Sequence, residues 1–173
     1  LITRDVLDKI WNGQIFLLGH SLGAGIAFIY NKFFDNIDKI SAWAPIAYLD
    51  RYSDRQKEIW KKNGYIEFQV NQTNQTLRMN LDYLLDIENN AEKYSIIDSV
   101  KNLSIPLQII YGQEDLTITK YERNILTSNL NHNDVSIIYI NNTGHTFGYS
   151  SNKREIGKGF KEALKQTIEF FNK

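Results

Sequence analysis

Residues 13–28, GQIFLLGHSLGAGIAF, constrain the fold more than any other part of the chain. Residues 15–18 form a short, continuous apolar run, which is typical of a strand buried on both faces. From residue 22 onward the apolar side chains follow the helical period instead. Gly-His-Ser-Leu-Gly separates the two patterns. The stretch therefore predicts a strand that turns sharply into a helix, with Ser21 at the turn.

The rest of the hydrophobic pattern alternates between strands and helices. Apolar runs predict strands over 37–44, 106–111 and 135–140, and helical periods predict helices over 3–11, 22–34, 119–130 and 156–171. Strands that alternate with helices form parallel sheets whose two faces are covered by those helices. The sequence therefore predicts an α/β fold with a mostly parallel sheet and helices on both faces.

Residues 46–100 interrupt this pattern with a polar, aromatic and irregular stretch. It predicts a helix over 54–62, a hairpin of strands 65–70 and 76–81, and one or two short helices within 81–100. We therefore expect a core built from 1–45 and 101–173, with 46–100 as an insertion. Its many aromatic side chains are expected to pack the insertion rather than to bind a ligand.

Composition excludes several classes of function. A chain of 173 residues suits one domain, and its 20 Lys and Arg balance its 20 Asp and Glu. With no net basic field, we expect neither a nucleic acid nor an anionic membrane as partner. The chain has no cysteine, which excludes disulfides, thiolate zinc sites and a cysteine nucleophile. That fits a reducing compartment, and no apolar run approaches the ~20 residues of a membrane span, so we expect a cytoplasmic protein.

A serine hydroxyl is a weak nucleophile unless a base accepts its proton and an acid orients that base. Asp115 follows the predicted strand 106–111, and His145 follows the strand 135–140. Both therefore come at carboxyl ends of parallel strands, where open α/β sheets place their sites. Glu114 is the alternative acid. The other two histidines, His20 and His132, follow no later strand.

The turn itself supplies two further features. The strand and the helix are expected to approach too closely for side chains at Gly19 and Gly23. The backbone N–H of Leu22, at the start of the helix, points toward the place where an oxyanion would form. Ser21, Asp115 and His145 occur in the chain order that such sheets use, and this layout needs no metal and no cofactor.

Three stretches carry a family resemblance: LLGHSLGAGIA, IPLQIIYGQEDLTI and INNTGHTFG. They resemble the C-terminal part of the α/β-hydrolases, and most closely the dienelactone hydrolase and prolyl-oligopeptidase-related groups. The resemblance implies Ser21 as nucleophile in the nucleophile elbow, Asp115 as triad acid, His145 as base and Leu22 N–H as an oxyanion donor. It fades across 46–100, which takes the position of the family's cap.

The sequence differs from this family on the N-terminal side of the elbow strand. The family sheet has about eight strands, and this sequence supplies the elbow strand and the three after it. We therefore expect a portion of a longer enzyme, lacking the upstream loop that gives the second oxyanion donor. The elbow strand would then be a bare apolar edge, prone to aggregation or to pairing in a homodimer, and catalysis by this portion would be weakened.

The expected reaction is hydrolysis of a carboxylic ester, with a small-molecule ester or amide as the substrate. Two alternatives remain open from the sequence. One is a serine peptidase or aminoacyl hydrolase, and the other is a non-catalytic binding protein on a hydrolase scaffold.

Overall fold

The computed structural model describes residues 13–34, 36–70, 75–131, 133–149 and 156–173. Within them, four strands form a parallel sheet in the order β1-β2-β5-β6. These are β1 (Phe16–His20), β2 (Lys39–Trp43), β5 (Leu107–Gly112) and β6 (Val135–Ile140). Each overlaps a strand predicted from the apolar runs. The helix predicted over 3–11 and the residue His132 lie outside the described residues.

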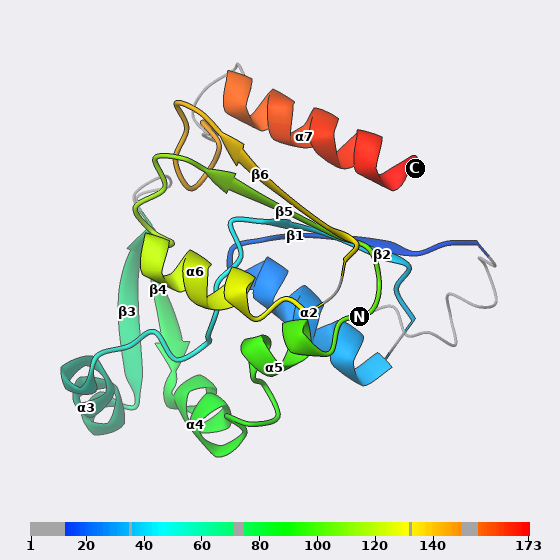
Figure 1. The fold of residues 1–173 in the computed structure, drawn as a ribbon. Helices are drawn as coiled ribbons and strands as arrows, with labels where there is room; N and C mark the ends of the chain where they lie inside the picture. Colours follow the sequence, from blue (N-terminus) through cyan, green and yellow to red (C-terminus); the bar gives the residue numbers. More distant parts are fainter. Residues whose placement is uncertain (1–12, 35, 71–74, 132, 150–155) are drawn as a thin grey trace.

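Helices cover both faces of this sheet (Figure 1). On one face lie α2 (Leu22–Phe34), α5 (Ile96–Lys101) and α6 (Lys120–Ser128), and on the other lies α7 (Lys158–Phe171). The α/β fold with a mostly parallel sheet is therefore confirmed. In the described part of the chain, no helix combines the length and apolarity that crossing a membrane requires.

The two central strands explain the continuous apolar runs. Every residue of β5 is buried, and so is every residue of β2 after Lys39. The polar side chains among them satisfy one another: Ser41 Oγ donates to Gln108 Oε1 at 2.9 Å, and Trp43 Nε1 donates to Thr167 Oγ1 at 2.9 Å. Because Thr167 belongs to α7, these bonds fix that helix to the sheet.

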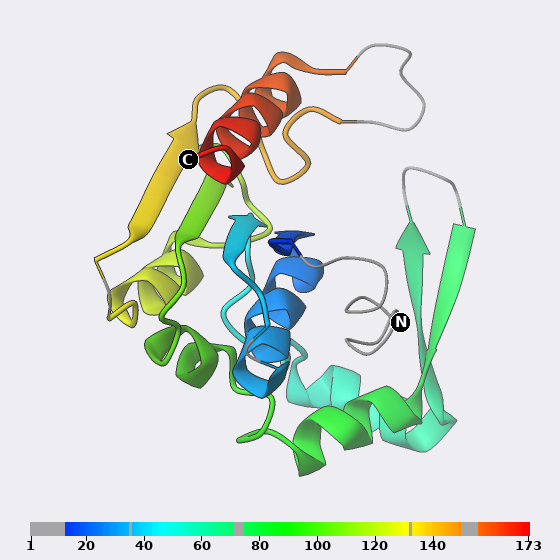
Figure 2. The same cartoon turned by 90° about the vertical axis from the view of Figure 1, so that its right-hand side faces the viewer.

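The middle of the expected insertion has a small core of its own, whereas Ile46, Ile96 and Val100 at its two ends are buried in the main core. This middle part contains α3 (Asp54–Asn63), the antiparallel pair β3 (Tyr65–Val70) and β4 (Gln75–Asn80), and α4 (Leu81–Asn89). Figure 2 shows the hairpin rising from α3 and α4. Trp60 is fully buried and contacts the rings of Tyr52 and Tyr83, and with Leu84 it forms the centre of a separate small core. The predicted hairpin is thus present, and these aromatic side chains pack the insertion.

The strand that precedes Ser21 lies at one edge of the sheet as described, because β1 pairs with β2 alone in this part of the chain. Its Leu18 side chain is 50% exposed. An apolar side chain of this exposure on an edge strand is the arrangement that favours further pairing.

The structure corrects one expectation about the turn. A Cβ at Gly19 would come within 2.6 Å of Ala24 Cα and of Gly23 O, so the close approach expected there is present. A Cβ at Gly23 would meet nothing within 4 Å among the described residues. The crowding expected at Gly23 is therefore wrong, because a side chain there would enter open space among the described residues.

This difference predicts opposite outcomes for two matched substitutions. Gly19→Ala forces a backbone clash, and we expect it to lower the free energy of unfolding by more than about 2 kcal/mol. Gly23→Ala introduces alanine into the first turn of α2, where it has room, and should change stability by less than about 1 kcal/mol, toward stabilisation. Urea unfolding of the two variants beside the parent protein measures both. Equal destabilisation by the two alanines would contradict the geometry.

Candidate active site

Ser21 occupies a strained position at the carboxyl end of β1. Its φ is 55°, in the left-handed region that side chains other than glycine rarely adopt. The backbone holds it there: Ser21 N donates to Trp43 O at 2.8 Å, and Gly25 N donates to Ser21 O at 3.2 Å. Such strain persists only where the surrounding structure imposes it. The sharp turn presents the Ser21 hydroxyl at the end of the sheet.

A chain of two hydrogen bonds joins the three residues singled out in the sequence. Ser21 Oγ–H donates to His145 Nε2 at 3.0 Å, and His145 Nδ1–H donates to Asp115 Oδ2 at 2.9 Å. In sequence, His145 lies 30 positions after Asp115 and 124 positions after Ser21. Ser21 follows β1, Asp115 follows β5 and His145 follows β6. Parallel strands bring them together because their carboxyl ends meet at one edge of the sheet.

The Asp115 carboxylate is completely buried, and both of its oxygens accept hydrogen bonds. While Oδ2 accepts from His145, Oδ1 accepts from Thr117 N at 2.7 Å and from Ile118 N at 3.1 Å. Backbone donors of this kind stabilise the ionised carboxylate and fix its orientation. Glu114, the alternative acid, is exposed to solvent, whereas the buried Asp115 carboxylate accepts from the imidazole. The geometry thus favours Asp115 as the partner of His145.

Two more contacts fix the loops that carry the acid and the histidine. Arg123 of α6 donates from Nη2 to Asp115 O at 2.6 Å and from Nε to Ile118 O at 2.9 Å. Gly112, at the end of β5, lies so close to the histidine loop that an added Cβ would be 2.4 Å from Gly144 O. Only glycine allows the two loops to approach this closely.

His20 is a site residue whose contact the sequence did not reveal. Its Nε2–H donates to His145 O at 2.8 Å, and the centroids of the two imidazole rings are 4.8 Å apart. Burial lowers the pKa of His20 below its usual 6.5, which favours the neutral form of the ring beside His145. The hydrogen bond ties the turn that carries Ser21 to the loop that carries His145. The sequence shows only that His20 precedes the serine, and nothing in it marks this partner.

The start of α2 adds a donor to the site. Leu22 is the first residue of that helix, so its N–H has no acceptor within the helix. The positive end of the helix dipole lies at the same place. This N–H is therefore free of the helical ladder and available to a negatively charged group bound beside Ser21.

An apolar pocket of about 410 Å³ lies beside His20. Its walls come from β1, β2, the histidine loop and α7, with Leu18, Trp43, Phe147 and Phe160 among the lining side chains. Among the described residues, no cluster of three or more His, Cys, Asp or Glu side chains has an arrangement that would hold a metal ion.

Several solved structures share this fold. A putative hydrolase from Agrobacterium vitis S4 is 15% identical with a TM-score of 0.71, and the match covers 95% of this chain and 64% of that one. Paleococcus ferrophilus monoacylglycerol lipase is 14% identical with a TM-score of 0.67, covering 97% of this chain and 72% of the lipase. Mouse alpha/beta hydrolase domain-containing protein 10 is 16% identical with a TM-score of 0.66, covering 96% and 65%. At such identities the likeness shows the fold alone, and this chain spans slightly less than two thirds of the Agrobacterium hydrolase.

Comparison by sequence defines the relationship further. No curated protein sequence matches the chain. The profile of one family, described as BAAT / Acyl-CoA thioester hydrolase C terminal, matches residues 6–149. That match spans the turn at Ser21, the insertion, Asp115 and His145, and together with the structural neighbours it confirms the assignment to the α/β-hydrolases. The chain therefore belongs to the BAAT / Acyl-CoA thioester hydrolase C terminal family, within the α/β-hydrolase superfamily.

Proposed function

We propose that this chain carries the catalytic triad of a serine hydrolase that transfers an acyl group from a carboxylic ester to water. The observation that supports the proposal best is the hydrogen-bond chain from Ser21 through His145 to Asp115, with donor–acceptor distances of 3.0 and 2.9 Å. These distances lie within the range at which a base accepts a proton from an attacking hydroxyl.

In the acylation half of the proposed reaction, Ser21 Oγ attacks the ester carbonyl carbon while His145 Nε2 takes the hydroxyl proton. The carbonyl oxygen becomes an oxyanion that Leu22 N–H stabilises. Asp115 holds the imidazole in the tautomer that can accept this proton and stabilises the imidazolium that forms. The imidazolium then gives its proton to the leaving alkoxide, and the acyl group remains on Ser21.

In the deacylation half, water attacks the acyl-serine carbonyl while His145 again takes a proton. Collapse of the second oxyanion returns that proton to Ser21 Oγ and releases the carboxylic acid. One hydrolysed ester gives one acid and one alcohol, with the enzyme restored.

A thioester is the second candidate substrate, because the description of the matched family names acyl-CoA thioester hydrolases. The same attack, oxyanion and proton transfer serve both substrates, since only the leaving group differs. The apolar pocket beside His20 supports an acyl group as the part of the substrate held near the site.

Covalent labelling of the whole protein by a fluorophosphonate probe tests the serine chemistry. We expect one label per chain, on Ser21, and none on the Ser21→Ala variant. A protein that takes no label, or a variant that labels equally, would contradict the proposal and favour a binding protein on a hydrolase scaffold.

Substrate class is tested by measuring kcat/KM for p-nitrophenyl acetate, an acyl-CoA and an aminoacyl-p-nitroanilide on the same preparation. We expect the ester or the thioester to exceed the anilide in kcat/KM, because an amine is a poorer leaving group than an alkoxide or a thiolate. The reverse order would assign the triad to a peptidase or aminoacyl hydrolase.

A further inference from the structure

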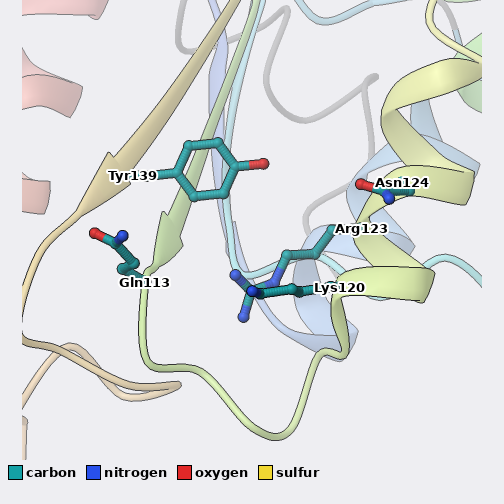
Figure 3. Close-up of a pocket in the computed structure, with 5 residues that line it drawn as sticks. All are labelled: Gln113, Lys120, Arg123, Asn124 and Tyr139. Carbon is teal, nitrogen blue, oxygen red and sulfur yellow. The ribbon is translucent and has the colours of Figure 1, made fainter.

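A second pocket lies away from Ser21, between α6 and the ends of β5 and β6 (Figure 3). Its volume is about 310 Å³, and we refer to it as the α6 pocket. Its lining side chains share the ability to donate hydrogen bonds: Gln113, Lys120, Arg123, Asn124 and Tyr139. Two of the five are cations and none is an acid. Figure 3 shows the Lys120 and Arg123 side chains extending from α6 toward the end of β5.

The positive charge of Arg123 is buried. The residue is 4% exposed, and its two hydrogen bonds go to backbone carbonyls, those of Asp115 and Ile118. Its guanidinium also stands 5.1 Å from the centroid of the Tyr111 ring. The two buried carboxylates nearest Arg123 in the described chain pair with other side chains, Glu122 with Arg51 and Asp115 with His145. A buried cation without a counter-charge is unfavourable, and an anion in contact with it relieves the cost.

The neighbouring residue in α6 shows the contrast. The Glu122 side chain is 2% exposed, and it pairs with Arg51 at 3.0 Å while accepting from Ala47 N at 3.0 Å. The fold thus supplies a partner for the buried charge of Glu122, whereas the buried Arg123 and the solvent-exposed Lys120 line the α6 pocket.

We propose that the α6 pocket binds the phosphate group of a small phosphorylated molecule and thereby activates the enzyme. A phosphate offers three oxygens and up to two negative charges, which match two cations and the Gln113 and Asn124 amides better than a carboxylate does. The half-exposed ring of Tyr139 provides a surface for the organic part of the molecule.

Activation follows from the position of Arg123, and this part of the inference rests on the proposed function. The guanidinium that faces the pocket donates at 2.6 Å to the backbone oxygen of Asp115, whose carboxylate holds His145 at 2.9 Å. A phosphate that restrains Arg123 restrains the Asp115 loop as well. A more rigidly positioned Asp115 orients the imidazole of His145 in the transition state. Phosphate binding should therefore raise kcat and leave KM unchanged.

Binding is measured first, on the Ser21→Ala form of the whole protein, so that the result does not depend on hydrolysis. By calorimetry with inorganic phosphate we expect a Kd on the order of 1 mM. Phenyl phosphate should bind more tightly because its ring contacts Tyr139, and acetate should bind at least about tenfold more weakly than phosphate. No phosphate binding, or acetate binding as well as phosphate, would overturn the site.

Variants then locate the site. Lys120→Gln should weaken phosphate binding about fivefold or more, whereas Lys62→Gln, which removes an exposed charge from α3, should leave it unchanged. Gln113→Glu places a carboxylate beside the two cations and should abolish binding without unfolding the protein. If Lys62→Gln and Lys120→Gln weaken binding equally, the anion is bound by net charge alone and the pocket assignment is wrong.

Activity is measured last, with p-nitrophenyl acetate. Saturating phosphate should raise kcat about twofold in the parent protein and leave the Lys120→Gln variant unchanged at the same concentration. Phosphate that binds without changing kcat overturns the activation. A parent protein with no turnover at all would instead contradict the proposed function, while the binding results would still decide the phosphate site.

Discussion

Replacing Ser21 by alanine is expected to lower kcat for ester hydrolysis by about four to six orders of magnitude while the protein stays folded. The loss is large because the hydroxyl that donates to His145 at 3.0 Å is the atom that would form the acyl bond. Alanine fits the same space, so the fold has no reason to change. Steady-state kinetics with p-nitrophenyl acetate measures the loss, and circular dichroism checks the fold.

A second variant separates the chemistry from the strain at the turn. Ser21→Gly should lose as much activity as the alanine variant but should be more stable than it by about 1 kcal/mol, since a φ of 55° costs glycine little. Ser136→Ala, on the exposed part of β6, serves as the matched control and should retain full activity. Residual turnover in Ser21→Ala close to that of the control would exclude Ser21 as the nucleophile.

The sequence predicted the sheet because its central strands are buried on both faces. A strand such as β5, with every residue buried, must be apolar nearly throughout, and so it stands out from the helical periods around it. Once the strands are known, parallel topology brings their carboxyl ends together. Ser21, Asp115 and His145 could therefore be selected as candidates without any knowledge of side-chain positions.

Contacts that depend on packing across the sheet could not be read from the pattern. The bond from His20 to the backbone of His145 joins residues 125 positions apart and depends on the path of a loop. The buried position of Arg123 depends in the same way on how α6 packs. Gly23 shows the converse case: the spacing of the two glycines suggested equal crowding, whereas only Gly19 faces the neighbouring backbone. Periodicity gives the face of an element and says little about the distance to its neighbour.

Asp115→Asn is expected to lower kcat by about four orders of magnitude, although it changes the side chain by only one group. Oδ1 accepts from two backbone N–H groups, so the asparagine oxygen is held there and its NH₂ faces His145 Nδ1. An NH₂ cannot accept from Nδ1–H, and the imidazole is driven to the tautomer that carries its proton on Nε2. In that tautomer Nε2 cannot take the proton of Ser21.

Glu114→Gln is the matched control, because it removes the neighbouring carboxylate by the same chemical change. Glu114 is exposed, and we expect this variant to retain kcat within about twofold of the parent protein. Measuring both variants against pH separates loss of the base from a shift in its titration, since the asparagine variant should remain slow across the whole range in which the protein is folded. If Glu114→Gln were the slower of the two, the orienting acid would be Glu114, and the buried carboxylate of Asp115 would serve only to shape the loop after β5.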